Sequence, residues 1–344
     1  MCLVRKKFRF GFFTIIFFSL ATFVTARAEQ TYDHGPIFSL IEENDLIVKT
    51  DRHYTQGIKL SYLHKDGFFP LCSSNIYEGL PEWGFTKKQG KVGYEIGQNI
   101  YTPGNLMATS LLPNDRPYAG WLYTGLVLQR RGETASGWPV LESFQLDLGV
   151  IGPWSLAKEA QTWVHQLRGF DVPRGWSNQL KNEPGIEIKY QRSIRFRGHA
   201  LHPLDFEFIP HAGFSLGNVE TTGRVGGQFR IGLNLPDDYG IQTIDSLTTT
   251  SGGHSRSQTF SRWGCYVFAS SEGKAVGHNA FLDGNLFHNS HSVDKEYLVG
   301  DFKAGFAFVL PRAEIGFSYV LRTREFHGQT EPDRFGSVYL KAKF

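Results

Sequence analysis

Apolar and polar residues alternate with period two along most of the chain from Tyr32 onward. In segment 143–151, Phe144, Leu146 and Leu148 lie on one face of an extended strand, and mainly polar residues lie on the other. Such alternation predicts β-strands with one apolar and one polar face. After Tyr32 no apolar run approaches the ~18 residues of a membrane-spanning helix. The pattern therefore favours an all-β fold and excludes a bundle of membrane helices.

Counting the alternating segments gives twelve predicted strands. They lie near residues 37–44, 55–64, 92–101, 118–130, 143–151, 185–193, 204–217, 224–234, 262–271, 299–309, 312–324 and 335–344. A thirteenth candidate, 281–287, is short and contains Asp283, Gly284 and Asn285. It would break the even strand number that single-chain bacterial barrels keep, so we predict a loop there.

The C-terminal segment distinguishes a membrane barrel from a soluble sandwich, which would produce the same alternation. Val338, Leu340, Ala342 and Phe344 share one face, and the last residue is aromatic. A terminal strand of this kind resembles the assembly signal of bacterial outer-membrane barrels, whose closed sheet satisfies every backbone hydrogen bond within lipid. We therefore predict a twelve-stranded antiparallel transmembrane β-barrel over residues 29–344.

Residues 1–28 predict a secretory signal peptide. Four basic residues precede the apolar run 10–24, and Ala26-Arg27-Ala28 has the form of a signal-peptidase site. An uncleaved membrane anchor is the alternative, although the run is shorter than the ~20 residues that a spanning helix needs. The sequence thus predicts export. Cys72 and Cys265 can pair in an oxidising compartment, but two thiols alone do not decide whether they do.

Composition and charge narrow the class of function. The 344 residues are 41% hydrophobic and include 29 Phe and 14 Tyr, which excludes a disordered chain. The 36 Lys and Arg exceed the 33 Asp and Glu by three. Residues 1–28 contain five of the bases and no acid, so 31 bases and 33 acids follow, a charge of −2. No basic surplus is left to displace counterions from phosphates, which excludes a nucleic-acid binder.

The loops after odd-numbered strands should face the cell exterior, because both termini of such a barrel are periplasmic. The informative exterior loops are 44–54, 102–116 and 152–183. The third contains an amphipathic helix predicted from Trp154 to Leu167 and ended by Gly169. Gln161 and His165, four residues apart, project from one face of this helix. A histidine that is merely solvated on a loop helix is the simpler interpretation.

The strand order places further polar residues at the same exterior end of the barrel, here called the exterior rim. Asn44 and Asp45 lie at the top of the first strand, and Thr55 lies at the top of the second. Asp45 can orient an imidazole or a water, and His165 can remove a proton. Asp171 with main-chain carbonyls can hold a hard cation. Topology alone therefore suggests an acid–base site with oxygen ligands on the exterior rim.

Several motifs, in order over residues 37–190, carry a resemblance to a known family. They are Glu43-Asn44-Asp45, Asp51-Arg52-His53-Tyr54-Thr55-Gln56-Gly57, Asn114-Asp115-Arg116-Pro117-Tyr118-Ala119-Gly120-Trp121, Gly149-Val150-Ile151-Gly152-Pro153, Gln161, His165, Gly175-Trp176 and Gln179-Leu180-Lys181-Asn182-Glu183-Pro184. With this set the sequence resembles the outer-membrane lipid A 3′-O-deacylase family. Beyond residue 190 only the barrel pattern carries the resemblance.

The resemblance implies a site between the barrel wall and the loop helix. It also implies calcium-dependent ester hydrolysis similar to that of secreted phospholipases A2. His165 matches the family's general base, and Asp45 matches its essential aspartate, with Asn44 beside it. Gln161 lies one helical turn before the histidine.

The same resemblance assigns the metal and the substrate contacts. Thr55 and Asp171 match metal-site positions, and Asp171 stands where the longer Glu is expected. Leu46 stands where a second Asp can occur. Segment 102–112 contains no Lys or Arg in the region where a basic pair can meet the substrate's phosphate, so Arg116 is the nearest candidate for substrate binding.

Two classes of function follow from these residues. The first is a monomeric enzyme of the bacterial outer membrane whose active site faces the cell exterior. It would use Ca²⁺ to remove the 3′ acyloxyacyl group from lipid A, the anchor of lipopolysaccharide in the outer leaflet, and would need no serine nucleophile. The second is a non-enzymatic barrel, either an adhesin or a narrow channel. An outer-membrane phospholipase with the same residues and a different product is a further alternative.

Overall fold

The computed structural model describes residues 35–45, 53–70, 73–201, 203–247 and 263–344. The predicted signal peptide, 1–28, and Cys72 lie outside these ranges. The strands are β1 (Ile37–Asn44), β2 (His53–Leu63), β3 (Phe85–Thr102), β4 (Ala119–Thr134), β5 (Pro139–Ile151), β6 (Glu183–Ile194), β7 (Phe196–Leu201), β8 (Leu204–Gly217), β9 (Glu220–Leu233), β10 (Gly264–Asn279), β11 (Leu298–Val309), β12 (Ala313–Arg322) and β13 (Asp333–Lys343). The α-helices are α1 (Ser73–Gly79), α2 (Ala157–Arg168) and α3 (Ala280–Asp283). Within the described ranges, each helix is too short or too polar to cross a membrane.

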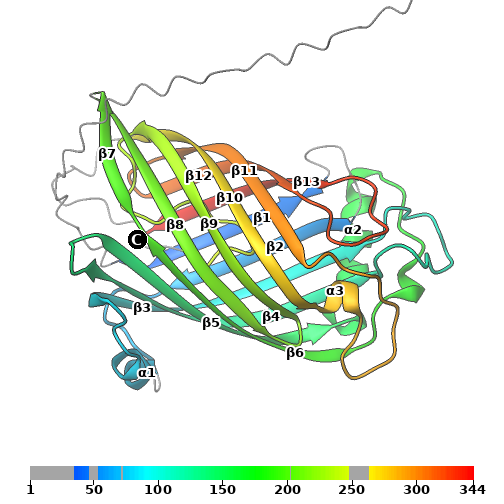
Figure 1. The fold of residues 1–344 in the computed structure, drawn as a ribbon. Coiled ribbons are helices and arrows are strands. Elements are labelled where there is room, and N and C mark those ends of the chain that lie inside the picture. Colours follow the sequence, from blue (N-terminus) through cyan, green and yellow to red (C-terminus); the bar gives the residue numbers. More distant parts are fainter. Residues whose placement is uncertain (1–34, 46–52, 71–72, 202, 248–262) are drawn as a thin grey trace, which may run out of the picture.

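The strands form one closed antiparallel barrel (Figure 1). The first and last strands close it, with Ile37 of β1 opposite Lys343 of β13. The pairing of β6 with β5 ends at Ile194, and β7 follows directly after β6. Both β6 and β7 pair with β8. β6 and β7 together serve as one strand of the wall. The assigned strands therefore make the twelve-stranded barrel that the sequence predicts.

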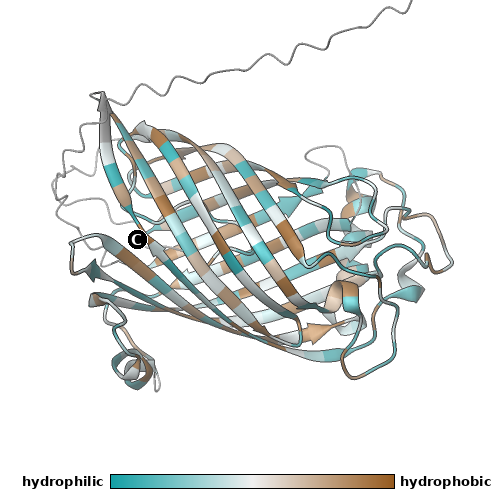
Figure 2. Cartoon of the chain, viewed as in Figure 1, coloured by the Kyte–Doolittle hydropathy of each residue, from teal (hydrophilic) through white to brown (hydrophobic). Residues whose placement is uncertain are grey.

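Polar side chains face the barrel lumen, and apolar side chains face outward. On β2, Ile58, Leu60 and Tyr62 are exposed, whereas Lys59 and Ser61 are buried. Figure 2 shows this alternation as brown and teal bands along the strands. A soluble sandwich would bury its apolar faces instead. The arrangement is therefore that of a membrane barrel.

The two ends of the barrel carry different elements (Figure 1). α2 and α3 lie at one end, here called the helix end. α1, β7 and the C-terminus lie at the other, here called the C-terminal end. Segment 281–287, predicted as a loop, contains no strand, and its first three residues belong to the single turn of α3.

Two strands extend well beyond their predicted limits. β3 begins at Phe85 rather than near 92, and β10 continues to Asn279 rather than ending near 271. Residues 86–89 and 272–274 are predominantly polar, so they lack the apolar alternation used for the prediction. Ladder hydrogen bonds need only backbone groups, and both extensions pair with their neighbouring strands.

A segment between β9 and β10 fills the lumen. We call residues 235–247, most of which are buried, the lumen segment. Near the C-terminal end, Asp238 pairs with Lys341 of β13 at 2.9 Å. Toward the helix end, Asp245 pairs with Arg322 of β12 at 3.0 Å. The segment therefore runs along the inside of the barrel and is held by charges on the wall.

Candidate active site beneath the loop helix

Helix α2 lies against the outward-facing side of the wall. Neighbouring residues of a strand face opposite sides, and Tyr101 and Trp121 line the lumen. Ile100 and Gly120, next to them, therefore face outward. Ile100 packs with Ala157 of α2 in a buried apolar cluster. The helix thus covers β3 and β4 from outside, near the helix end of the barrel.

Gly120 permits this close approach. A Cβ atom at residue 120 would lie 2.1 Å from Ser155 Oγ and 2.3 Å from Ala157 Cβ. Gln98 of β3 also donates a hydrogen bond to the main-chain oxygen of Ser155, at 2.6 Å. Any side chain at position 120 would move the start of the helix away from the wall.

The start of the predicted helix was wrong, whereas its existence and its end are confirmed. Pro153–Ser155 forms a separate 3₁₀ turn, and Leu156 has a φ of 58°. A left-handed residue cannot continue a right-handed helix, so α2 begins at Ala157. Gly169, with a φ of 71°, ends the helix as expected.

Gln161 and His165 lie on the buried face of α2, and each is only 1% exposed. The indole Nε1 of Trp176 donates a hydrogen bond to Gln161 Oε1 at 2.9 Å. An indole N–H can only donate, so the amide oxygen of Gln161 faces Trp176 and the amide Nε2 points away from it. Within the described part of the chain, Gln161 Nε2 has no hydrogen-bond partner. A buried amide donor of this kind is available to a bound group.

The imidazole of His165 is held in one orientation. Its Nδ1 lies 2.7 Å from the main-chain oxygen of Asp171. A carbonyl oxygen only accepts, so Nδ1 carries the hydrogen and Nε2 of the neutral ring carries the lone pair. The Phe170 ring packs against the imidazole with centroids 6.0 Å apart. This geometry leaves Nε2 as the atom that can accept a proton.

The strand ends beneath α2 supply further polar groups. Thr55 lies in a β-bulge, where the register of β2 against β3 shifts between Tyr54 and Gln56. Its Oγ1 lies 2.7 Å from Oγ1 of Thr102. Thr102 has the same strand parity as Ile100, so this hydroxyl pair lies on the outward side of the wall.

Asn44 ends β1, Asp45 follows it directly, and both are buried. Glu43 accepts a hydrogen bond from the lumen segment, so the next residue, Asn44, faces outward. Glu42, which has the same parity as Asn44, pairs with Arg168 at the end of α2 at 3.9 Å. The helix therefore reaches from β4 across the outer wall to β1.

The fold thus gathers four of the predicted residues between α2 and the outer wall: Asn44, Thr55, Gln161 and His165. Asp45 adjoins them in sequence at the end of β1. The helix supplies the side-chain amide of Gln161 and the imidazole of His165. The wall supplies the side-chain amide of Asn44 and the hydroxyl of Thr55.

Arg116 lies apart from this group. Its Nη1 is 3.1 Å from Glu325 Oε2, and its guanidinium lies 4.8 Å from the ring centroid of Tyr101, which lines the lumen. The remaining Nε and Nη2 atoms have no hydrogen-bond partner in the part of the chain that is described. The guanidinium is thus on the lumen side, and its role in substrate binding stays a prediction.

The oxygen donors near α2 fit a hard divalent cation in kind. They are side-chain oxygens of Asn44, Asp45, Thr55, Thr102 and Asp171. Calcium prefers such carboxylate, amide and hydroxyl ligands. The described residues contain no group of three His, Cys, Asp or Glu side chains arranged for a metal. The side chain of Asp171 is exposed, and motif residue Asp51 lies outside the described ranges.

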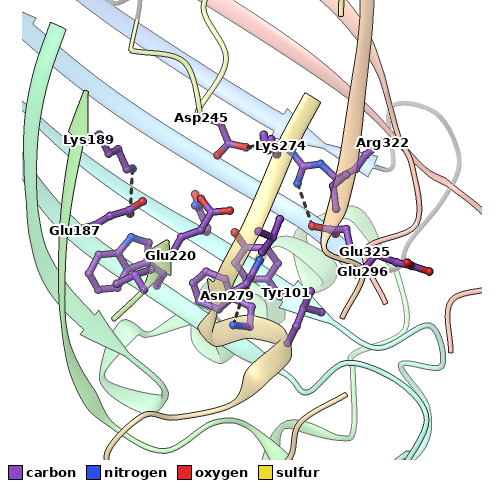
Figure 3. A pocket seen from close by; sticks show the side chains of 17 residues that line it. Tyr101, Glu187, Lys189, Glu220, Asp245, Lys274, Asn279, Glu296, Arg322 and Glu325 are labelled. Carbon is purple, nitrogen blue, oxygen red and sulfur yellow. Dashed lines mark hydrogen bonds and ion pairs between the residues drawn. The ribbon is translucent and has the colours of Figure 1, made fainter. Parts of the chain in front are cut away.

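A second polar region lies inside the barrel at the helix end (Figure 3). It is a cavity of about 40 Å³ bordered by ion pairs, including Glu187–Lys189 at 3.2 Å and Asp245–Lys274 at 3.1 Å. A space of this size holds a few waters and cannot hold an acyl chain. None of the predicted site residues lines it. The lumen and the site beneath α2 are therefore separate.

His53 is a buried histidine to which the sequence assigned no role. It has a φ of 66°, and its Nδ1 lies 2.6 Å from Asp333 Oδ1. Its Nε2 lies 3.6 Å from Asp115 Oδ1. The two carboxylates come from distant parts of the sequence, so no local pattern could have revealed the cluster.

One motif that sequence reasoning missed is Gly213-Phe214-Ser215-Leu216-Gly217, which has Gly-x-Ser-x-Gly spacing. It lies within β8, and buried Ser215 accepts a hydrogen bond from Arg224 Nη2 at 2.9 Å. A nucleophile elbow requires a strand–turn–helix junction. Ser215 is therefore a structural residue of the lumen.

Together, the closed wall, its apolar exterior and its polar lumen define an outer-membrane β-barrel with a polar site on the outside of the wall. A family model described as outer membrane protein LpxR matches residues 12–344. The chain belongs to this family. A search of the curated proteins gives no match.

Two solved structures are similar to this chain. LpxR from Salmonella typhimurium is similar over 90% of this chain and 100% of that chain, with 20% identity and a TM-score of 0.71. The β domain of the Bordetella autotransporter BrkA covers 90% of this chain at 9% identity, with a TM-score of 0.42. The first similarity shows that the barrel architecture is shared.

Proposed function

We propose that the protein is a calcium-dependent lipid A 3′-O-deacylase of the outer membrane, with its active site facing the cell exterior. The observation that carries the proposal is the orientation of His165 beneath α2. Its Nδ1–H is bound to the Asp171 carbonyl, which leaves Nε2 as a base on the outward side of the wall. Membership of the outer membrane protein LpxR family supports this assignment.

The residues support a direct hydrolysis. His165 Nε2 takes a proton from a water whose oxygen attacks the ester carbonyl of the 3′ acyloxyacyl group. The tetrahedral intermediate then expels the sugar oxygen, which receives the proton from the imidazolium. The fatty acid and the free 3′ hydroxyl are the products. Atoms and charge balance without a serine nucleophile.

Gln161 and the oxygen donors have supporting roles. The Nε2 group of Gln161, positioned through Trp176, can donate to the developing oxyanion. When bound, Ca²⁺ would supply electrophilic stabilisation of that charge. Asn44, Asp45, Thr55 and Asp171 would hold it.

The lumen argues against the narrow-channel alternative. The lumen segment occupies the interior and is fixed by Asp238 with Lys341 and by Asp245 with Arg322. The residual cavity at the helix end is only about 40 Å³. An adhesin or a phospholipase would leave the 3′ acyl group of lipid A in place.

Mass spectrometry of lipid A from cells with and without the protein tests the proposal. We expect lipid A to lose the 3′ acyloxyacyl group only when the protein is present, and the released fatty acid to match the mass difference. Unchanged lipid A in cells that contain the folded barrel would contradict the enzyme, and loss of acyl chains from phospholipids would identify a phospholipase.

A further inference from the structure

Helix α2 has three distinct flanks, and the site uses only one. The buried flank carries Ala157, Gln161 and His165. Because successive helical residues are rotated by 100°, the apolar residues project to one side of this buried flank and the polar residues to the other side. The apolar flank consists of Leu156, Ala160, Trp163, Val164 and Leu167. The polar flank consists of Lys158, Glu159, Thr162 and Gln166.

The outer part of the apolar flank is uncovered, whereas Ala160 packs against the buried cluster beneath the helix. Trp163 is 64% exposed and Leu167 is 70% exposed. Trp154 before the helix and Phe170 after it are also exposed. Exposed patches of this composition mark contact with protein or lipid. We call the five exposed residues the apolar flank surface; they are Trp154, Leu156, Trp163, Leu167 and Phe170.

The position of α2 indicates what covers this surface. The helix lies on the outside of β3 and β4, where the wall faces lipid. Further along the same outward faces, Tyr94 and Ile96 of β3 and Leu126 of β4 are exposed. Helix α2 therefore adjoins the lipid-facing surface of the barrel. A cluster of Trp, Leu and Phe opposite a charged flank is typical of a helix that lies in a membrane interface.

We propose that α2 is an interfacial membrane helix whose apolar flank surface is immersed in the acyl chains of the outer leaflet, with its polar flank in water. The proposal rests on the barrel's place in the membrane and does not require that the site hydrolyses lipid A. It also gives the candidate site a direct approach from the bilayer. Phe170, one of the exposed residues, packs against the His165 ring, so the surface is in direct contact with the candidate site.

Nitroxide labels on the two flanks of α2 test the proposal. Single cysteines at Trp163 and Leu167 sample the apolar flank, and single cysteines at Glu159 and Gln166 of the same helix are matched controls. Cys72 and Cys265 are replaced by serine, and the whole barrel is reconstituted in vesicles of phospholipid and lipopolysaccharide. The collision rate of each nitroxide with oxygen, which concentrates in lipid, is compared with its collision rate with a water-soluble nickel chelate.

We expect oxygen to be the more effective collider at 163 and 167 and the nickel chelate to be the more effective at 159 and 166. If the nickel chelate is the more effective collider on both flanks, the proposal is overturned. Dipolar broadening at 163 that disappears on dilution with unlabelled barrel would also overturn it, because a second copy of the chain would then cover the surface.

A second measurement avoids labelling. Phospholipids brominated on their acyl chains should quench tryptophan fluorescence of the unmodified protein, and Trp163→Phe should reduce the quenched fraction. Trp83→Phe, which removes an exposed tryptophan in the connection between α1 and β3, controls for the loss of one fluorophore. No change in the quenched fraction with Trp163→Phe would contradict immersion, whether or not the protein cleaves lipid A.

Discussion

The ring Nδ1 of His165 and the main-chain oxygen of Asp171 lie 2.7 Å apart across the end of α2. The helix ends at Gly169, and the chain then turns so that the carbonyl two residues later faces the imidazole. A main-chain acceptor fixes the tautomer, because a carbonyl oxygen can only accept a hydrogen bond. This arrangement suits a base that must present Nε2 to water.

Replacing His165 by Ala should reduce deacylation by about a hundredfold or more, the usual contribution of a general base. The barrel should still fold, because His165 lies on a loop helix outside the strand ladder. Lipid A mass spectra and heat-modifiable migration in gels measure the two effects. His288→Ala, at an exposed histidine of another loop, is the matched control and should be fully active. Near-normal hydrolysis by His165→Ala would remove this residue from the mechanism.

Asp45→Asn should also give a folded barrel with about a hundredfold less activity, because the amide retains size and hydrogen bonding but loses the charge that orients a base or binds a cation. Asp45 is buried at the end of β1. If it only caps the strand end, the variant should hydrolyse lipid A normally. Initial rates with purified lipid A distinguish these outcomes.

Chelation of divalent ions should abolish turnover, and added calcium should restore it. The reason is the all-oxygen donor set beneath α2, which suits a hard cation. The folded barrel should persist during chelation, as judged by heat-modifiable migration. Full activity in metal-free protein would show that the oxyanion is stabilised by protein groups alone.

Gly120→Ala should lower activity by about a hundredfold, since a displacement of ~1 Å at a catalytic group can have such an effect. The new Cβ would meet Ser155 Oγ at 2.1 Å and push α2 from the wall. Gly223→Ala is the control, because a Cβ at 223 has no atom within 4 Å. Equal activity of the two variants would show that α2 tolerates displacement.

Asp238→Ala should destabilise the barrel by about 3–5 kcal/mol, because it leaves the buried Lys341 without one of its two carboxylates. That lysine lies 2.9 Å from both Asp238 and Glu314. Denaturant unfolding of the purified barrel measures the loss. Asp294→Ala, at an exposed loop acid, should change stability by no more than about 0.5 kcal/mol. Equal free energies of unfolding for the two variants would mean that the ion pairs of the lumen segment do not hold it in place.

Several features of the site were predictable, and others depended on distant contacts. Gln161 and His165 share a helical face because of their spacing, and the structure buries that face against the wall. The bulge at Thr55 was not predictable, because it arises from pairing with β3 rather than from local sequence. The pairing of Arg116 with Glu325, a residue 209 positions away, was equally invisible.

Two features of the sequence together predicted the barrel: the alternation that recurs in every strand of a membrane wall, and the aromatic C-terminal strand, which distinguishes such a wall from a soluble sandwich. The sequence also predicted a helix in the loop 152–183 and its C-terminal stop at Gly169. The packing of α2 on the outside of the wall, and the filling of the lumen by residues 235–247, could be learned only from the three-dimensional structure. Both depend on contacts between surfaces far apart in sequence: the close approach at Gly120, and the ion pairs of Asp238 and Asp245 with wall residues. Local periodicity carries no information about such partners, since each becomes a partner only when the barrel closes.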